Sequence, residues 1–412
     1  MGFAETCEVA FAQGPKRLRP WAGFVNYGSI VGRSPSPALD FIDAIDTDLG
    51  PPLSIDGSNN KLRFILVRTS KRQRNIEFVD YSLAATYLGV LCVYVVFIGA
   101  SCKEVRVFDE FTPQYKLSVA TYCAMTLVPL VLICQIRNLK YLVPFSAIAN
   151  ALLVGIFAIT MYYMFTNLPP PREREMVADF TQWPLFISTA MFAMEGIGVV
   201  MPIENEMAKP QQFLGCPGVL NVAMFVVVIL YGIFGFFGYV RFGDDVKGSI
   251  TLNLPPEDLI AQSAKFLMAV VILFSYSLQF YVPMEMIWRR LRSKVSARYH
   301  NLTQVAVRTT IVTGSVAVAA AFPDLENVIS LVGAVFFSTL GLLIPVIVET
   351  VYKWNKGLGP CNCIILKNII IGVIGLIALI AGSYSSVKGM VRDLGENNDF
   401  INDTDILYGN VF

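Results

Sequence analysis

Residues 191–203 read MFAMEGIGVVMPI, and they place a carboxylate, Glu195, deep inside an apolar stretch that extends from 182 to 203. Each glycine weakens a helix by about 1 kcal/mol relative to alanine, and proline removes a backbone hydrogen bond. The EGIG motif at 195–198, with a proline soon after it, therefore predicts a helix that is broken near its middle. Broken helices in membrane transporters expose backbone groups that bind substrates and coupling ions. The alternative is that the glycines only permit close helix packing and that Glu195 bonds to a neighbouring helix.

The rest of the chain is also unusually apolar. Of its 412 residues, 55% are hydrophobic and only 15% are charged, whereas soluble domains are about 45–50% apolar and about 25% charged. A helix needs about 20 mostly apolar residues to cross a bilayer core that is about 30 Å thick. Nine segments meet this requirement, so the sequence predicts an all-α membrane protein with nine transmembrane helices. These segments are approximately 81–101, 117–136, 141–165, 182–203, 218–240, 261–288, 305–322, 328–351 and 368–387.

The distribution of Lys and Arg predicts the orientation of these helices. Basic residues concentrate in alternate linkers, above all in the segments 61–74 and 289–298. Because cytoplasmic loops carry an excess of Lys and Arg, we expect the N-terminus in the cytosol and the C-terminal tail on the opposite side. Asn402, in the sequence Asn402-Asp403-Thr404, would then be an extracytosolic glycosylation acceptor. The net charge of +1 gives no indication of a nucleic-acid partner.

Ionisable residues inside membrane spans are costly, so each is a functional candidate. Four of them lie within a turn or two of a span end, and we expect their side chains to extend to the interface. The four are Lys265, Glu285, Arg308 and Glu349. Glu195 alone lies deep. The sole histidine, His300, falls in a basic loop, so any proton coupling within these spans would need a carboxylate.

A set of longer motifs accompanies the EGIG stretch. They are FAMEGIGVVMPIENEM at 192–207, KPQQF at 209–213, GFFGYVRFGDD at 235–245, TLNLP at 251–255, QFYVP at 279–283, FPDL at 322–325 and SLVGA at 330–334. Together they resemble the motifs of the proton-coupled amino acid transporters, a subgroup of the amino acid/auxin permease family. The resemblance covers about residues 76–390. It implies an eleven-span, leucine-transporter-type fold with two inverted five-span repeats.

The resemblance also predicts how the chain is divided. Residues 1–23 are expected to be the end of the second span with its basic cytosolic cap, and 24–75 a flexible cytosolic segment and candidate insertion. The transmembrane transporter domain is expected at 76–390, and an extracytosolic tail at 391–412. The chain would then be an incomplete or alternatively spliced product that lacks the first span and most of the second. In the family fold, the first span supplies half of the substrate site and the histidine that is linked to proton coupling.

The function that the resemblance implies is secondary active transport of small neutral amino acids, as proton-coupled symport, in the plasma membrane or a lysosomal membrane. The expected partners are these amino acids and the lipid bilayer, with protons as the coupling ion. We expect neither an enzymatic activity nor a cofactor. The alternative is a non-transporting membrane scaffold or nutrient-sensing subunit. The missing half of the site suggests this alternative, as does the basic segment 61–74, which could bind a partner or acidic lipid.

The candidate substrate site centres on Glu195, whose carboxylate could take a proton or bond the substrate amine. Gly196 and Gly198 would expose backbone groups to the substrate, and Phe192 would form a wall of the pocket. Three further residues are expected, by analogy with the fold, to line the same cavity, although such side chains more often pack or bond to their own helix. They are Tyr94, Ser275 and Ser277.

Overall fold

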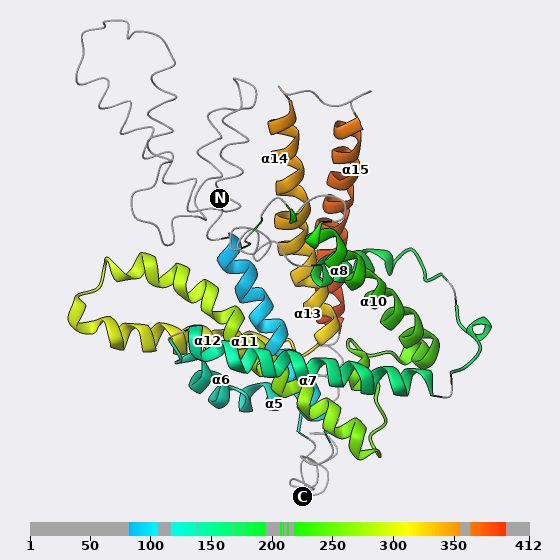
Figure 1. Cartoon of the computed structure of the whole chain (residues 1–412), viewed down its shortest axis with the longest axis horizontal. Coiled ribbons are helices and arrows are strands. Elements are labelled where there is room, and N and C mark those ends of the chain that lie inside the picture. The colour runs from blue at the N-terminus through cyan, green and yellow to red at the C-terminus, as the bar shows by residue number, and fades with distance from the viewer. Residues whose placement is uncertain are drawn as a thin grey trace, which may run out of the picture. The chain divides into compact units, whose positions relative to one another are not determined.

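The computed structural model describes the part of the chain that contains most of the apolar segments. The described residues are 82–105, 117–137, 139–166, 168–175, 177–194, 207, 209, 212–213, 218–354 and 363–392. Within these ranges every regular element is a helix, as Figure 1 shows, and no residue is in a strand. The all-α prediction is therefore confirmed for the described part of the chain.

Seven helices in the described part of the chain are long and apolar enough to cross a membrane. They are Ser82–Lys103, Pro144–Phe165, Val219–Asp245, Leu259–Arg292, Ala297–Ala321, Leu325–Lys353 and Cys363–Arg392. Two shorter apolar helices, Val119–Cys134 and Trp183–Ala193, fall in the other two predicted spans. The second of these covers only the first half of the predicted span 182–203, and most of the remainder lies outside the described residues. The protein is thus an integral membrane protein with multiple apolar helices.

The described elements have the following order along the chain. After the helix Ser82–Lys103 they are α5 (Val119–Met125), α6 (Leu127–Cys134), α7 (Leu139–Phe165), η2 (Pro171–Glu173), α8 (Trp183–Ala193), α10 (Val219–Phe242), η4 (Gly243–Asp245), η5 (Ile250–Asn253), α11 (Leu259–Arg292), η6 (Ala297–Tyr299), α12 (His300–Ala321), α13 (Leu325–Val332), η7 (Gly333–Leu343), α14 (Ile344–Lys353), α15 (Cys363–Ile377) and η9 (Ala378–Gly382). The segments η7 and η9 are π-helical, whereas η2, η4, η5 and η6 are single 3₁₀ turns.

Local sequence explains several of the helix boundaries. The break between α5 and α6 falls at Thr126, and Pro129 lacks the N–H that would bond to the carbonyl of Met125 across it. Ser118 begins α5 because its hydroxyl accepts a hydrogen bond from the Thr121 N–H at 3.3 Å. Asp324 begins α13 in the same way, since its carboxylate accepts from two N–H groups of the first turn.

The larger of two compact units comprises the described residues of Leu83–Glu195, Lys209–Leu343 and Gly372–Phe412. Its main core joins the helix Ser82–Lys103 to α5, α6, α11, α12 and α13 through fully or nearly fully buried side chains. These include Leu91, Val95, Cys123, Leu130, Tyr276, Phe280, Val312 and Val328. In lipid, helices associate through such close packing and through hydrogen bonds, because lipid tails are as apolar as the side chains. A polar contact inside the core, 2.7 Å between the hydroxyls of Tyr276 and Ser315, also ties α11 to α12.

A second core lies between α7 and α11, which pack along each other within the same unit. Ala149 and Ile156 of α7 contact Ala261 and Ala264 of α11 in this cluster. The smaller unit includes α14 and the start of α15. There, Lys367 forms an ion pair of 2.7 Å with Glu349.

Candidate functional site

The helix α8 leads to the predicted site and ends immediately before it. Pro184 stands in its first turn, where a missing N–H costs nothing. Its last residue is Ala193, and Met194 has left helical geometry with φ −92° and ψ 15°. The carbonyl of Ala193 accepts a hydrogen bond of 2.9 Å from the hydroxyl of Tyr231 on α10. A carbonyl that a helix end leaves unpaired therefore has a side-chain partner here.

The last turn of α8 packs on a π-helical segment. Phe192 meets Phe337 of η7 edge-on, with ring centroids 5.6 Å apart and an interplanar angle of 73°. Phe192 also packs against the main core of the larger unit, as does Tyr94 of the helix Ser82–Lys103. The structure thus brings these two predicted site residues to one hydrophobic core.

A junction of small residues fixes α8 between η7 and η9. Ser188 is fully buried, and its hydroxyl donates to the carbonyl of Pro184 at 2.8 Å and lies 3.4 Å from that of Ala378 in η9. A Cβ added at Gly333 would meet the Ser188 carbonyl oxygen, and one added at Gly382 would meet the Ser188 hydroxyl. Glycine is thus required at both positions for the helices to approach this closely. π-Helical turns are rare and often occur at functional sites.

Ser275 and Ser277, on α11, use their hydroxyls within their own helix. Ser275 donates to the carbonyl of Val271 at 3.0 Å, and Ser277 donates to the carbonyl of Phe274 at 2.7 Å. Each hydroxyl keeps acceptor capacity, so their role in substrate binding stays a prediction. Four further residues of the predicted sites lie outside the described residues. They are Glu195, Gly196, Gly198 and Asn402.

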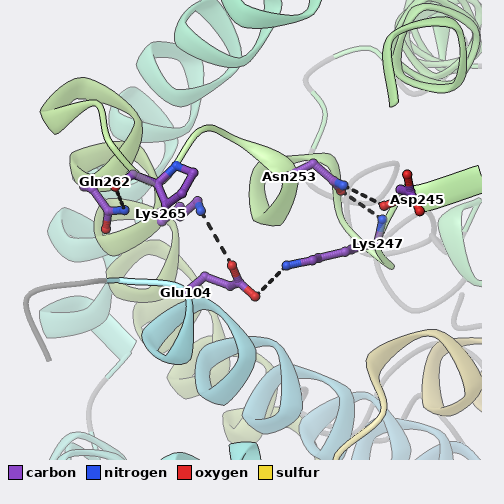
Figure 2. Close-up of polar contacts among 7 residues, drawn as sticks. Glu104, Asp245, Lys247, Asn253, Gln262 and Lys265 are labelled. Carbon is purple, nitrogen blue, oxygen red and sulfur yellow. Dashed lines mark hydrogen bonds and ion pairs between the residues drawn. The ribbon is translucent and has the colours of Figure 1, made fainter. Parts of the chain in front are cut away.

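Figure 2 shows a charged network that the sequence did not lead us to expect. Lys265 of α11 is buried, with a side chain only 1% exposed, and its ammonium lies 3.8 Å from the carboxylate of Glu104. The other oxygen of the same carboxylate is 2.6 Å from the ammonium of Lys247. The Lys265 side chain is therefore covered by protein and paired, whereas its position relative to the membrane interface stays a prediction. Glu104 directly follows the helix Ser82–Lys103, and it supplies a partner that makes burial of the lysine tolerable.

The loop that carries Lys247 is held in place by its own polar contacts. The N–H of Lys247 donates to the side-chain oxygen of Asn253 at 2.9 Å, and the amide of Asn253 donates to the carbonyl of Asp245 at 2.8 Å (Figure 2). Gln262 of α11 donates to the carbonyl of Pro256 at 2.8 Å. This loop, residues 245–256, therefore presents Lys247 to Glu104 in a defined position.

Arg308 of α12 is also buried by protein, at 6% exposure. Its guanidinium donates to the carbonyl of Cys134, the last residue of α6, at 2.5 Å and to that of Ile136 at 3.4 Å. A cation at the C-terminus of a helix is favourable because the last carbonyls carry partial negative charge. Among the described residues, no carboxylate lies within ion-pair distance of Arg308, and Glu285 attracts it only at longer range.

Comparison with known proteins identifies the family. The family described as transmembrane amino acid transporter protein matches residues 73–388, which is more than half of the chain. The chain belongs to this family. Its relatives include the proton-coupled amino acid transporter-like protein pathetic of Drosophila melanogaster, which is 39% identical over 319 residues, or 77% of this chain and 67% of the relative. The probable amino acid transporter skat-1 of Caenorhabditis elegans is 27% identical over 328 residues, or 77% of this chain and 71% of the relative.

Membership of the transmembrane amino acid transporter family confirms the resemblance that the motifs indicated. The protein is a membrane transporter of amino acids and is not an enzyme. Among the described residues, no group of three His, Cys, Asp or Glu side chains could hold a metal ion.

Three features of this transporter were missed by reasoning from sequence. Neither Tyr231 nor Ser188 belongs to a sequence motif, and only the packing of the helices shows what they contact. The pair formed by Glu104 and Lys265 did leave a signal, because the predicted topology puts both residues at the same end of their spans. A carboxylate directly after one span and a lysine near the start of another could have been paired on that ground.

Proposed function

We propose that this protein is a secondary active transporter that moves small neutral amino acids across a membrane by symport with protons. The family supports transport of amino acids, and the name of the Drosophila relative supports the coupling to protons. The preference for small neutral substrates is our own extension of the motif resemblance. The plasma membrane and a lysosomal membrane are the proposed locations, with the N-terminus in the cytosol.

One observation carries the assignment of the site: α8 ends at Ala193, and Tyr231 bonds the carbonyl at that end. The end falls in the interior of the apolar stretch 182–203, where a spanning helix would ordinarily continue. Glu195 comes two residues later in the chain. In our proposal its carboxylate takes the proton or bonds the substrate ammonium. Gly196 and Gly198 leave backbone groups open to the substrate.

The side of the site that the described residues supply is apolar. Phe192 and Tyr94 pack against one core, and we propose that they face the substrate from α8 and from the helix Ser82–Lys103. An apolar wall of this kind favours small uncharged side chains, since a charged side chain would lose its hydration without gaining a partner. Ser275 and Ser277 complete the proposed lining from α11.

The proposed architecture is the leucine-transporter type, with nine spans of this chain corresponding to the third to eleventh of the family. The seven long helices and the two shorter apolar helices support that count. In such folds, discontinuous helices supply the substrate site near the middle of the bilayer. The proposed orientation leaves Asn402 on the extracytosolic side as a glycosylation acceptor.

The test is uptake of labelled glycine, alanine and proline into proteoliposomes that contain the purified chain, with and without an inward proton gradient. We expect the gradient to stimulate uptake in the wild type. Glu195→Gln keeps the size of the side chain and removes its charge, so uptake should fall to the level seen without a gradient. Glu349→Gln is the matched control, because Glu349 is a partly exposed carboxylate in an ion pair with Lys367. Its uptake should stay at the wild-type level.

Two outcomes would contradict the proposal. If Glu195→Gln keeps uptake that responds fully to the gradient, Glu195 is not the coupling group. If the folded wild type takes up none of the three amino acids under any gradient, the alternative of a non-transporting scaffold or nutrient-sensing subunit is favoured.

A further inference from the structure

A strongly basic hairpin joins α11 to α12. Residues 288–300 read WRRLRSKVSARYH, and no acidic residue occurs between Glu285 and Asp324. The last turn of α11 alone contains Arg289, Arg290 and Arg292. The hairpin and the part of α12 that follows it therefore concentrate positive charge with no acidic residue among them.

The hairpin is ordered by its own contacts. The Lys294 N–H donates to the carbonyl of Leu291 at 2.9 Å, which closes the end of α11. The ring of His300 lies edge-on to that of Trp288, with centroids 5.5 Å apart, and its Nε2 is 3.0 Å from the carbonyl oxygen of Val295. These contacts bring the start of α12 back to the end of α11. The basic side chains are thus presented on one compact turn.

The exposed basic side chains of the hairpin include Arg292, Lys294 and Arg298. None of these three forms an ion pair with any residue that the structure describes. These three charges are therefore available to a partner that the described residues do not supply. Since guanidinium groups pair with phosphate through two parallel hydrogen bonds, a phosphate-bearing partner suits these residues.

Exposed apolar side chains accompany the basic ones. Tyr299 is 55% exposed and Leu302 is 68% exposed, and both lie beside Arg298 in the sequence or one turn later. Tyrosine is enriched at the membrane–water interface, and apolar groups beside basic ones favour binding to a charged bilayer surface. The hairpin lies at the end of α11, which is itself a candidate membrane span.

We propose that residues 288–302 form a binding surface for anionic, phosphate-bearing lipid headgroups. Basic clusters that directly adjoin a membrane span bind acidic lipids, and each basic residue strengthens binding about fivefold. Phosphoinositides, which carry several phosphates on one headgroup, fit the three exposed cations best. The site is distinct from the proposed substrate site, so the proposal stands whether or not the protein couples transport to protons.

The test uses the full chain purified in a neutral detergent. Binding of fluorescent, short-chain phosphatidylinositol bisphosphate is measured against short-chain phosphatidylcholine and against free inositol trisphosphate. The main variant replaces Arg292, Lys294 and Arg298 by glutamine. The matched control replaces Lys103, Arg172 and Lys388, which are exposed basic residues at other positions, by glutamine.

We expect the main variant to bind the phosphoinositide about 100-fold more weakly than the wild type, and the control variant to bind within about twofold of it. Phosphatidylcholine and free inositol trisphosphate should bind the wild type much more weakly than the phosphoinositide. A variant with Arg292→Lys and Arg298→Lys should bind more weakly than the wild type but more tightly than the main variant, because it keeps the charge and loses the paired guanidinium hydrogen bonds. Thermal unfolding of each variant checks that it is folded.

Several results would overturn the proposal. One is an equal loss of binding in the main and control variants, which would mean that only net charge matters. Another is equal binding of free inositol trisphosphate and the lipid, which would mean that a soluble phosphate compound is the ligand. A third is phosphoinositide binding that the main variant leaves unchanged.

Discussion

The two ends of α11 carry positive charge in very different surroundings. Near its start, the buried Lys265 shares the carboxylate of Glu104 with Lys247. At its end, about 40 Å away, Arg292, Lys294 and Arg298 form no ion pair with a described residue. The difference indicates that the first end satisfies its charge within the protein. The second end leaves its charge available to the membrane.

Arg308 of α12 shows a third way in which the protein accommodates a positive charge. It is buried like Lys265, but its guanidinium bonds to backbone carbonyls at the end of α6 instead of to a carboxylate. Arg174 does the same for α10, donating to the carbonyls of Val240 and Arg241 at 3.1 and 3.3 Å. Where an acidic partner is missing, the end of a helix can stabilise an arginine, whose flat donor group reaches several carbonyls.

The largest expected effect comes from removing the carboxylate at the first end. Glu104→Ala leaves Lys265 buried without its partner, so the free energy of unfolding should fall by about 3 kcal/mol. The measurement is denaturant-induced unfolding in mixed micelles. The double variant Glu104→Ala with Lys265→Met should recover most of this loss, because no uncompensated charge remains. A double variant as unstable as Glu104→Ala would mean that the ion pair is not what stabilises this end.

A smaller loss is expected from Arg308→Met. This change removes two charge-assisted hydrogen bonds and leaves the carbonyl of Cys134 without its guanidinium partner, so unfolding should become easier by about 2 kcal/mol. Arg137→Met is the matched control, since Arg137 is exposed and bonds to the side chain of Asn301 at 2.8 Å. The control should change stability by less than about 0.5 kcal/mol. Equal losses in both variants would show that burial does not distinguish the two arginines.

The smallest effect is expected from Lys247→Gln. The pair of Lys247 with Glu104 is short, but the lysine side chain is 46% exposed, and exposed ion pairs stabilise by about 0.2–1 kcal/mol. The loss should also disappear at high salt, because screening weakens exposed pairs first. Unfolding measured at low and high ionic strength checks this. A large loss that persists at high salt would show that this pair behaves as a buried one.

The sequence was a good guide to which segments are helices, because an apolar run long enough to cross a bilayer must satisfy its backbone groups internally, as a helix does. It was a poorer guide to their ends. The sixth predicted span stops at residue 288, whereas α11 continues to Arg292. Arginine lowers the hydropathy of a segment but is a good helix former, so a hydropathy criterion stops too early.

The candidate site was predictable only in part. The EGIG motif indicated that the helix breaks near Glu195, and α8 does end two residues earlier. The partner of that end, Tyr231, could not be predicted, because apolar periodicity does not say which helices are neighbours. The same limit applies to Ser188, whose importance comes from two glycines far away in the sequence.

The π-helical turn at Ala378–Gly382 has a consequence for the history of this chain. In a π turn each N–H bonds to the carbonyl five residues earlier instead of four, so the turn holds one residue more than an α turn. The helical segments before and after it therefore keep the same sides toward their neighbours. A related helix that is one residue shorter could have an α turn at this place and still present the same sides to its neighbours. A turn of this kind is therefore a place where a membrane span can absorb a change in length of one residue. Alignments of this last helix with shorter relatives should place their gap here and keep Gly382 in register with the serine that it contacts.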